Sequence, residues 1–207
     1  MKVLSVHLPR TGGTSLWGEF SNALGKEFLA DYDHDPLGEN ASKRLPFPDR
    51  KRILHGHFRP YTYQADGTYL VTFLRHPVSL VLSFYCFLKN WGVPSHELHK
   101  RLLKEQPSVV QFARWPQIQR LASQTYFGDF DMHRFDFIGS FENRAADLKR
   151  LGAELGLALE GVLHDNRLVK DAERERLKSD PALQSELAEL LREDIVFYYK
   201  LITPLCH

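Results

Sequence analysis

Short apolar runs alternate with segments of helical periodicity along the first ninety residues. Runs rich in branched and aromatic residues predict strands over 2–8, 28–32, 52–58 and 68–75. Leu16, Phe20 and Leu24 recur at helical spacing, and Pro77 stands at the favoured first position of a second, almost wholly apolar helix. The proline-rich segment 33–50 follows neither period, so we expect it to be irregular.

The second half of the chain is predicted to be mainly helical. An alternating run over 135–141 predicts one further strand. The predicted helices cover 95–123 with breaks at Pro107 and Pro116, 142–155, and 181–202 as one long amphipathic helix. Strands that alternate with helices predict an α/β fold of three layers, in which a central, mostly parallel sheet is flanked by helices and ligands bind where strands end.

Length and composition limit the number of domains and the classes of protein to which the chain can belong. The 207 residues, 43% of them hydrophobic, can bury one sizeable core, so we expect a single domain over 1–207. No stretch reaches the roughly 18 apolar residues of a membrane-spanning helix, and the opening MKVLSV lacks the features of a signal peptide. Cys86 and Cys206 are too few for a disulfide framework and lack zinc-site spacing. We therefore expect free thiols and a cytoplasmic protein.

The net charge of +1 conceals an uneven distribution. Residues 1–120 carry 16 basic and 10 acidic side chains, a balance of +6, whereas residues 121–207 carry 11 and 16, a balance of −5. Such a separation favours a positive field over one surface. We expect a small anionic ligand rather than a nucleic acid.

The strongest local signal is the segment Pro9-Arg10-Thr11-Gly12-Gly13-Thr14-Ser15, between the first predicted strand and the first predicted helix. Glycines let successive N–H groups converge, the helix N-terminus adds positive potential, and the Arg, Thr and Ser side chains are donors, so the loop is a candidate phosphate site. Its glycine spacing and its lack of lysine depart from the Walker pattern. A purely structural turn with a Thr or Ser cap is the alternative.

A second candidate anion site follows the fourth predicted strand. Arg75 ends that strand, and Ser83 lies eight residues later on the next helix. An arginine at the carboxyl end of a strand suits fork-like binding of a phosphate, to which Ser83 would add one donor. For Ser83 taken alone, a packing role within the helix is the commoner one.

Together the two segments resemble the sulfotransferase superfamily that uses 3′-phosphoadenosine 5′-phosphosulfate (PAPS), and in particular its carbohydrate branch, which includes the heparan sulfate 2-O-sulfotransferases. Residues 9–15 look like the 5′-phosphosulfate loop of that family, and Leu74-Arg75-His76-Pro77 with Ser83-Phe84-Tyr85 looks like its 3′-phosphate motif. Weaker similarity runs through 137–142 and 194–199.

The resemblance implies a P-loop-like fold in which Arg10, Thr11, Gly12, Gly13, Thr14, Ser15, Arg75 and Ser83 bind PAPS. It also implies that no metal is required and that the acceptor is a hydroxyl compound, for example an anionic glycan. The family usually carries lysine where this chain has Arg10, a planar fork in place of a compact ammonium. We expect Arg10 to stabilise the leaving phosphate instead.

His55 and His57 flank Gly56 at the end of the third predicted strand, where residues two apart face the same side. An imidazole is well suited to take a proton from an alcohol at neutral pH. By resemblance to an HGH segment of the glycan sulfotransferases, His57 is the predicted general base and His55 assists it. Two alternatives stay open, namely a metal-binding pair, for which no third ligand stands at motif spacing, and a structural hydrogen-bonding pair.

Basic and aromatic side chains around this segment are further candidates. A basic cluster, which would attract an anionic acceptor or simply keep a loop solvated, consists of Lys43, Arg44, Arg50, Lys51, Arg52 and Arg59. The aromatic residues that would stack on a sugar or adenine, unless they belong to the core, are Tyr61, Tyr63, Trp91 and Trp115.

The sequence therefore predicts an enzyme that transfers a sulfuryl group from PAPS to a hydroxyl group. One alternative is a small-molecule kinase of the P-loop type, which would need a Walker lysine and a magnesium ligand that the sequence does not display. The other is a non-catalytic nucleotide-binding module on the same fold.

Overall fold

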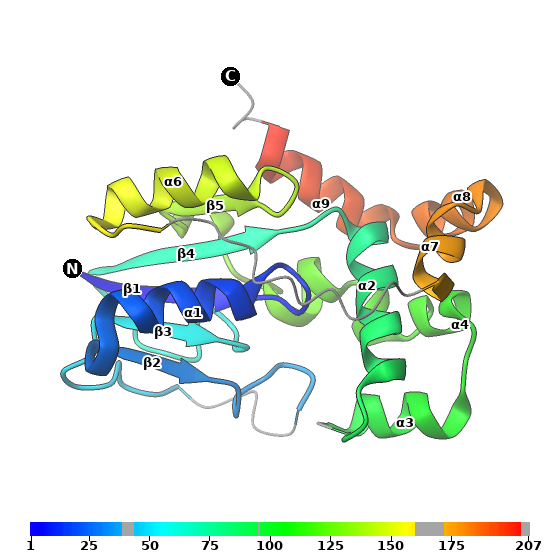
Figure 1. Ribbon diagram of the computed structural model, residues 1–207, viewed down its shortest axis with the longest axis horizontal. Helices are drawn as coiled ribbons and strands as arrows, with labels where there is room; N and C mark the ends of the chain where they lie inside the picture. The colour runs from blue at the N-terminus through cyan, green and yellow to red at the C-terminus, as the bar shows by residue number, and fades with distance from the viewer. Residues whose placement is uncertain (39–43, 95, 160–171, 204–207) are drawn as a thin grey trace.

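The computed structural model describes residues 1–38, 44–94, 96–159 and 172–203, which form an α/β fold of three layers (Figure 1). Its sheet has five strands in the order β2-β3-β1-β4-β5, and every neighbouring pair is parallel. The strands are β1 (Lys2–His7), β2 (Phe28–Asp31), β3 (Ile53–Gly56), β4 (Thr68–Leu74) and β5 (Phe137–Ser140). The predicted fold class and all of the predicted strands are confirmed.

Nine α-helices and three short helical turns connect or follow the described strands. The α-helices are α1 (Gly13–Leu24), α2 (Pro77–Asn90), α3 (Glu97–Glu105), α4 (Val109–Ala113), α5 (Pro116–Gln119), α6 (Arg144–Leu155), α7 (Ala172–Lys178), α8 (Pro181–Leu190) and α9 (Arg192–Ile202). The turns are η1 (Gly25–Glu27), the π-helical η2 (Leu121–Tyr126) and η3 (Met132–Arg134). The predicted breaks at Pro107 and Pro116 both occur. Within the described part of the chain, no helix has the length and apolar character needed to span a membrane.

Two hydrophobic cores lie on the two faces of the sheet. On one face, Leu16 and Phe20 of α1 and Leu148 of α6 pack against Val3 and Phe73. The larger core on the other face contains the alternate strand residues, such as Leu4 and Leu54, together with α2, α4, α8 and α9. This alternation follows from the period of two along a strand.

The strand order determines where a site can form. Central β1 pairs with β3 on one side and with β4 on the other, so the segments that follow these three strands emerge at one edge of the sheet. That edge faces α2, which stands across the carboxyl ends of the strands (Figure 1). In open parallel sheets, ligands bind at the carboxyl ends of two adjacent strands whose connections leave in opposite directions. The residues concerned are His7 and its loop, His57, and Arg75.

The prediction of one helix over 181–202 is wrong, because the helix breaks at Leu191 into α8 and α9. α8 packs against α2, α4 and α7, whereas α9 packs against β5 and η2. The buried Asp194 carboxylate of α9 accepts hydrogen bonds of 2.9 Å from the backbone N–H groups of Ala122 and Ser123 in η2. A straight helix could not reach both sets of partners. The apolar spacing continues through the bend, since Leu187 and Leu191 are both buried, and so it conceals the break.

Candidate functional site

The loop over 9–15 joins β1 to α1 and depends on two glycines. Gly12 has a φ of 88°, and a Cβ added there would lie 2.8 Å from the guanidinium of Arg144. A Cβ on Gly13 would lie 1.9 Å from the ring of His7. Arg10 also has a positive φ, 65°, which costs energy in a residue with a Cβ and is common in loops that bind ligands. The sequence thus builds a tight turn that begins α1 at the edge of the sheet.

Some side chains and amides of this loop form hydrogen bonds within the protein, and others are exposed. Thr11 is buried, and its hydroxyl donates to the carbonyl of Leu8 at 2.9 Å. The Gly13 N–H donates to Nε2 of His7 at 3.0 Å, so this amide is already bonded and does not face an external anion as predicted. Thr14 is exposed and lines the main cleft described below, while Ser15 is buried.

Arg10 connects the two predicted anion sites. Its Nε donates to the hydroxyl of Ser83 on α2 at 3.2 Å, and its guanidinium lies over the ring of Phe87, 4.5 Å from the centroid. Nη1 of Arg75 donates to the backbone carbonyl of Arg10 at 2.8 Å. The structure therefore brings together the residues that the sequence placed 73 positions apart.

Arg75 is almost fully buried at the end of β4. Its guanidinium lies over Phe141 at 4.1 Å, and its Nε has no hydrogen-bond partner within the described part of the chain. Burial, reinforced by the charge of Arg174, lowers the pKa of Arg75 to about 10. Arg174 on α7, which sequence reasoning missed, contributes in the same direction to the lowered pKa of Arg10, after burial. It lies in the run AERERLK, where nothing distinguishes it from the other charged side chains.

Glu142 ties the segment after Arg75 to the last helix. Its Oε1 accepts from the backbone N–H of His76 at 3.0 Å. Its Oε2 accepts from the hydroxyls of Ser140 and Tyr198, at 2.9 and 3.0 Å. The end of β5, the start of α2 and the middle of α9 are therefore held by one carboxylate.

Three histidine rings lie close together where β1 and β3 end, those of His7 and His55 stacked and that of His57 tilted against His7. The ring of His7 lies 5.1 Å from that of His55 and 4.6 Å from that of His57, so both predicted histidines project to the same side. His55 is fully buried and its Nδ1 is bonded to the hydroxyl of Ser5 at 2.9 Å. Burial and the neighbouring His57 lower the pKa of His55 to about 3. A neutral His55 with no face on the main cleft can support its neighbours but cannot touch a substrate there.

His57 follows β3 and is oriented by Asp35, a residue that sequence reasoning placed in an irregular segment and did not single out. Oδ2 of Asp35 lies 3.0 Å from Nδ1 of His57. Oδ1 accepts from the hydroxyl of Tyr126 and from the N–H of Leu37, both at 2.9 Å. Burial alone would raise the pKa of Asp35, but these hydrogen bonds and the His57 ring lower it below the ordinary value. A carboxylate so held fixes a proton on Nδ1 and leaves Nε2 as the basic nitrogen.

Several of these groups line a cleft of about 1050 Å³, which we call the main cleft. Its wall includes Arg10 and Thr14 from the loop, His57 with Asp35, and Trp91 beyond the end of α2. Arg75 and Ser83 are not part of this wall and lie behind Arg10. The structure thus joins the Gly-rich loop and the predicted base in one cavity, and Arg10 connects this cavity to the second predicted anion site. Among the described residues, no group of three or more His, Cys, Asp or Glu side chains is placed to hold a metal ion.

Comparison with known proteins identifies similar structures. No family model matches the chain, and no curated protein matches its sequence. A sulfotransferase from Alicyclobacillus acidocaldarius is 15% identical with a TM-score of 0.45, over 94% of this chain and 95% of that one. The mouse sulfotransferase SULT7A1 in complex with PAP is 15% identical with a TM-score of 0.42, over 92% of this chain but only 62% of the mouse chain. At this identity and TM-score, neither likeness assigns an activity to the protein.

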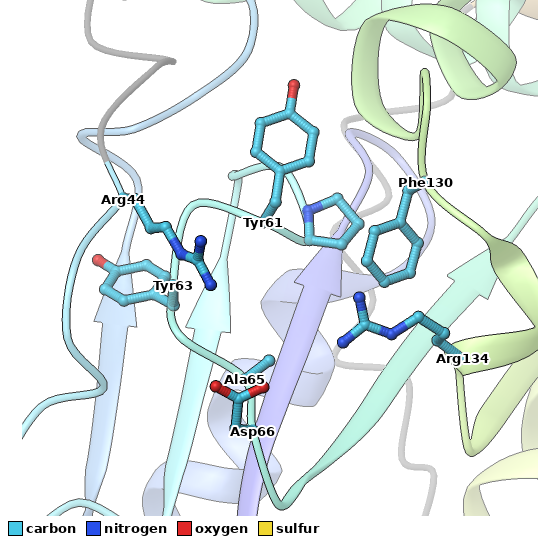
Figure 2. A pocket seen from close by; sticks show the side chains of 8 residues that line it. Arg44, Tyr61, Tyr63, Ala65, Asp66, Phe130 and Arg134 are labelled. Carbon is cyan, nitrogen blue, oxygen red and sulfur yellow. The ribbon is translucent and has the colours of Figure 1, made fainter.

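A smaller cavity of about 350 Å³ shares no lining residue with the main cleft. Arg44 and Arg134 reach toward it from opposite sides, with Phe130 beside Arg134 and Asp66 below (Figure 2). Tyr61 lines this cavity and is exposed, whereas Tyr63 also lines it but is 6% exposed and donates its hydroxyl proton to Asp31. None of the predicted donor-binding or catalytic residues belongs to it.

The basic cluster does not surround His57 as expected. β3 separates Arg50, Lys51 and Arg52, which precede the strand, from His57, which follows it. Lys51 and Arg52 are bonded instead to backbone carbonyls, Lys51 to those of Lys26 and Phe28, and Arg52 to that of Leu155. Arg59 donates to the carbonyl of Thr125 and to the hydroxyl of Tyr61. Lys43, like Cys206, lies outside the described residues.

The aromatic candidates divide between the cleft and the core. Trp91 is 49% exposed and lines the main cleft, so it is available to a ligand. Trp115 is buried against Phe112 and covered by Arg101, 4.2 Å from its ring, which makes it a core residue.

Proposed function

We propose that this protein is a PAPS-dependent sulfotransferase that transfers a sulfuryl group to a hydroxyl group of a carbohydrate or another small acceptor. The observation that carries the proposal is the arrangement in the main cleft, which is lined by Arg10, Thr14 and an Asp35-oriented His57 whose buried Nε2 has no hydrogen-bond partner among the described residues. The sequence resemblance to the carbohydrate branch of the sulfotransferases supports the choice of donor.

Two features support binding of a doubly anionic nucleotide. The 5′-phosphosulfate would lie on the loop, where the start of α1 supplies positive potential and Thr14 a hydroxyl. The 3′-phosphate would be held by Arg75 and Ser83, and the buried Nε of Arg75 that lacks a partner fits an anion that completes its bonding. Arg10, in contact with Ser83 and open to the cleft, would stand between the two anionic groups.

The proposed reaction requires one proton transfer and one displacement. Nε2 of His57 takes the proton of the acceptor hydroxyl, whose oxygen bonds to sulfur as the bond between sulfur and the 5′-phosphate oxygen breaks. Asp35 stabilises the imidazolium that forms, while Arg10 and the start of α1 stabilise the charge that develops on the leaving phosphate. The sulfuryl group carries less negative charge than a phosphoryl group, so side chains and backbone dipoles can do what magnesium does in kinases.

The acceptor would enter from the side of Trp91 and Lys100, which both line the main cleft, and it would compete with Glu97, whose carboxylate pairs with the Lys100 ammonium at 2.5 Å. An exposed indole offers a face for the apolar side of a sugar ring, and the ammonium group offers an ionic partner to a carboxylate or sulfate on a glycan. These two contacts are the support for a carbohydrate acceptor.

Calorimetric titration with 3′-phosphoadenosine 5′-phosphate (PAP), beside ADP, tests donor binding. We expect PAP to bind at least about tenfold more tightly, because ADP lacks the 3′-phosphate that Arg75 would pair with. Transfer of labelled sulfate from PAPS to pooled sugars and other hydroxyl compounds then tests catalysis. Equal binding of both nucleotides, with magnesium-dependent transfer from ATP, would point to the kinase alternative. PAP binding without transfer to any acceptor would point to the non-catalytic module.

A further inference from the structure

Arg144, the first residue of α6, carries a guanidinium that lies against the 9–15 loop. The residue is 5% exposed, and none of its three side-chain nitrogens has a hydrogen-bond partner among the residues that the structure describes. Its Nη1 lies 2.8 Å from the position a Cβ on Gly12 would take, so the group is in contact with the loop backbone. An arginine this deeply buried is ordinarily paired, because an unpaired buried charge is costly.

The groups around Arg144 do not provide that pairing. The ring of Phe73 lies 5.6 Å below the guanidinium. Burial lowers the pKa of Arg144, and the charge of Glu19 on α1 only partly offsets this effect. His7 and His55 also face the group, and its charge contributes to lowering the pKa of each. The Arg144 guanidinium therefore lies behind the wall of the main cleft, against the loop that begins α1 and close enough to His7 and His55 to lower the pKa of both.

We propose that Arg144 is the counter-charge for an oxyanion bound on the Gly12 loop. Under the proposed function, on which the identity of the anion rests, this group is the phosphosulfate end of the donor. In the free protein the guanidinium of Arg144 is unpaired among the described residues. When the anion is bound, the two groups pair. Arg144 thereby adds a second positive charge at the loop, beside that of Arg10. The free protein is destabilised by this side chain, and the ligand removes the cost.

The test is Arg144→Met in the full chain, with thermal unfolding and calorimetry against PAP and, separately, inorganic pyrophosphate. Methionine keeps the length of the side chain and packs on Phe73 without a charge, and replacing a buried unpaired charge by an apolar group is neutral or stabilising. We expect the Tm without ligand to equal or exceed that of the wild type. We expect the Kd for both anions to rise about tenfold or more, and the anion-induced rise in Tm to be largely lost.

Arg150→Met is the matched control. Arg150 lies on the same helix and over a phenylalanine ring, that of Phe137 at 4.2 Å, but it is more exposed and pairs with Asp147. Its loss should leave both anion affinities within about twofold of the wild type. Arg144→Lys is a second variant that retains the charge, and it should retain most of the anion-induced rise in Tm.

The outcomes separate this inference from the proposed function. Wild-type affinities in Arg144→Met, or a large fall of its Tm without ligand that Arg144→Lys shares, would overturn the inference and leave the function standing. If the wild type binds pyrophosphate through Arg144 but discriminates poorly between PAP and ADP, the inference stands and the proposed donor falls.

Discussion

Asp35→Asn tests the role of His57 most sharply, because the surrounding network fixes how the new amide must sit. Oδ1 of Asp35 accepts from the N–H of Leu37, which can only donate, and from the Tyr126 hydroxyl. Burial and the charge of Asp35 raise the pKa of Tyr126 far above its ordinary value, so its hydroxyl keeps its proton. The amide oxygen must therefore face Leu37, and the amide NH₂ must face Nδ1 of His57.

That orientation reverses the tautomer of His57. With a donor opposite Nδ1, the imidazole has to accept there and carry its proton on Nε2, the nitrogen that the reaction needs as a base. The Ser-His-Asp hydrolases give the scale of such a change, about 10⁴-fold in kcat, and a lost general base costs about 10²- to 10⁴-fold. We expect a fall in kcat within this range, with the affinity for PAP changed by less than about twofold.

The assay is the initial rate of labelled sulfate transfer as a function of pH, with Asp33→Asn as the control. Asp33 also lines the main cleft, and its substitution removes the same charge, but the described hydrogen bond of His57 Nδ1 goes to Asp35 and not to Asp33. Equal rates and equal pH profiles for the two variants would refute the reasoning.

The pH dependence of the unfolding free energy gives a second test of Asp35. Because the pKa of Asp35 is lowered in the folded protein, its contribution is present above the unfolded value, near 3.8, and is lost as the pH falls through the folded one. The gap in unfolding free energy between wild type and Asp35→Asn should therefore narrow below about pH 4.

Three other substitutions probe the loop, the base and the second anion site. His57→Ala should lower kcat by about 10²- to 10⁴-fold in the same transfer assay while calorimetry finds PAP affinity unchanged; lost binding would indicate a structural role. Arg75→Met should weaken PAP by about 10- to 100-fold yet leave adenosine 5′-phosphosulfate, which lacks the 3′-phosphate, nearly unaffected, and a uniform loss for both would contradict the assignment. Gly13→Ala should lower the free energy of unfolding in urea by about 2 kcal/mol, because its Cβ meets the His7 ring, whereas Gly92→Ala, with open space around it, should change it by less than about 0.5 kcal/mol.

Local pattern was sufficient to predict the strands and the loops that follow them. Branched apolar runs, the glycine pair and Pro77 act over a few residues, and each produced the expected element. Residues 50–52 were expected to lie around His57 and do not, which shows that closeness in sequence does not ensure closeness in space. A four-residue strand spans about 13 Å, so side chains next to His57 in the sequence are carried to the opposite edge of the sheet.

The missed residues share a different cause. Asp35, Arg144 and Arg174 become notable only because of partners far away in the sequence, such as Tyr126 for Asp35 and Gly12 for Arg144. A lone carboxylate or guanidinium in a polar segment is indistinguishable from a solvated one until the fold places it. Asp35 stands out by the three partners of its carboxylate, Arg144 by its burial without a hydrogen-bond partner among the described residues, and Arg174 by the effect of its charge on Arg10 and Arg75.

The carboxylate of Glu142 has a practical consequence for work with this protein. It links the N–H of His76, directly after Arg75, to the hydroxyl of Tyr198 in the final helix. A fusion partner that pulls on that helix would thus displace the segment after Arg75 without touching the cleft and, under the proposed function, would weaken nucleotide binding. The first strand begins at the opposite edge of the sheet, away from α2 (Figure 1), which makes the amino end the safer place for a purification tag or a surface tether.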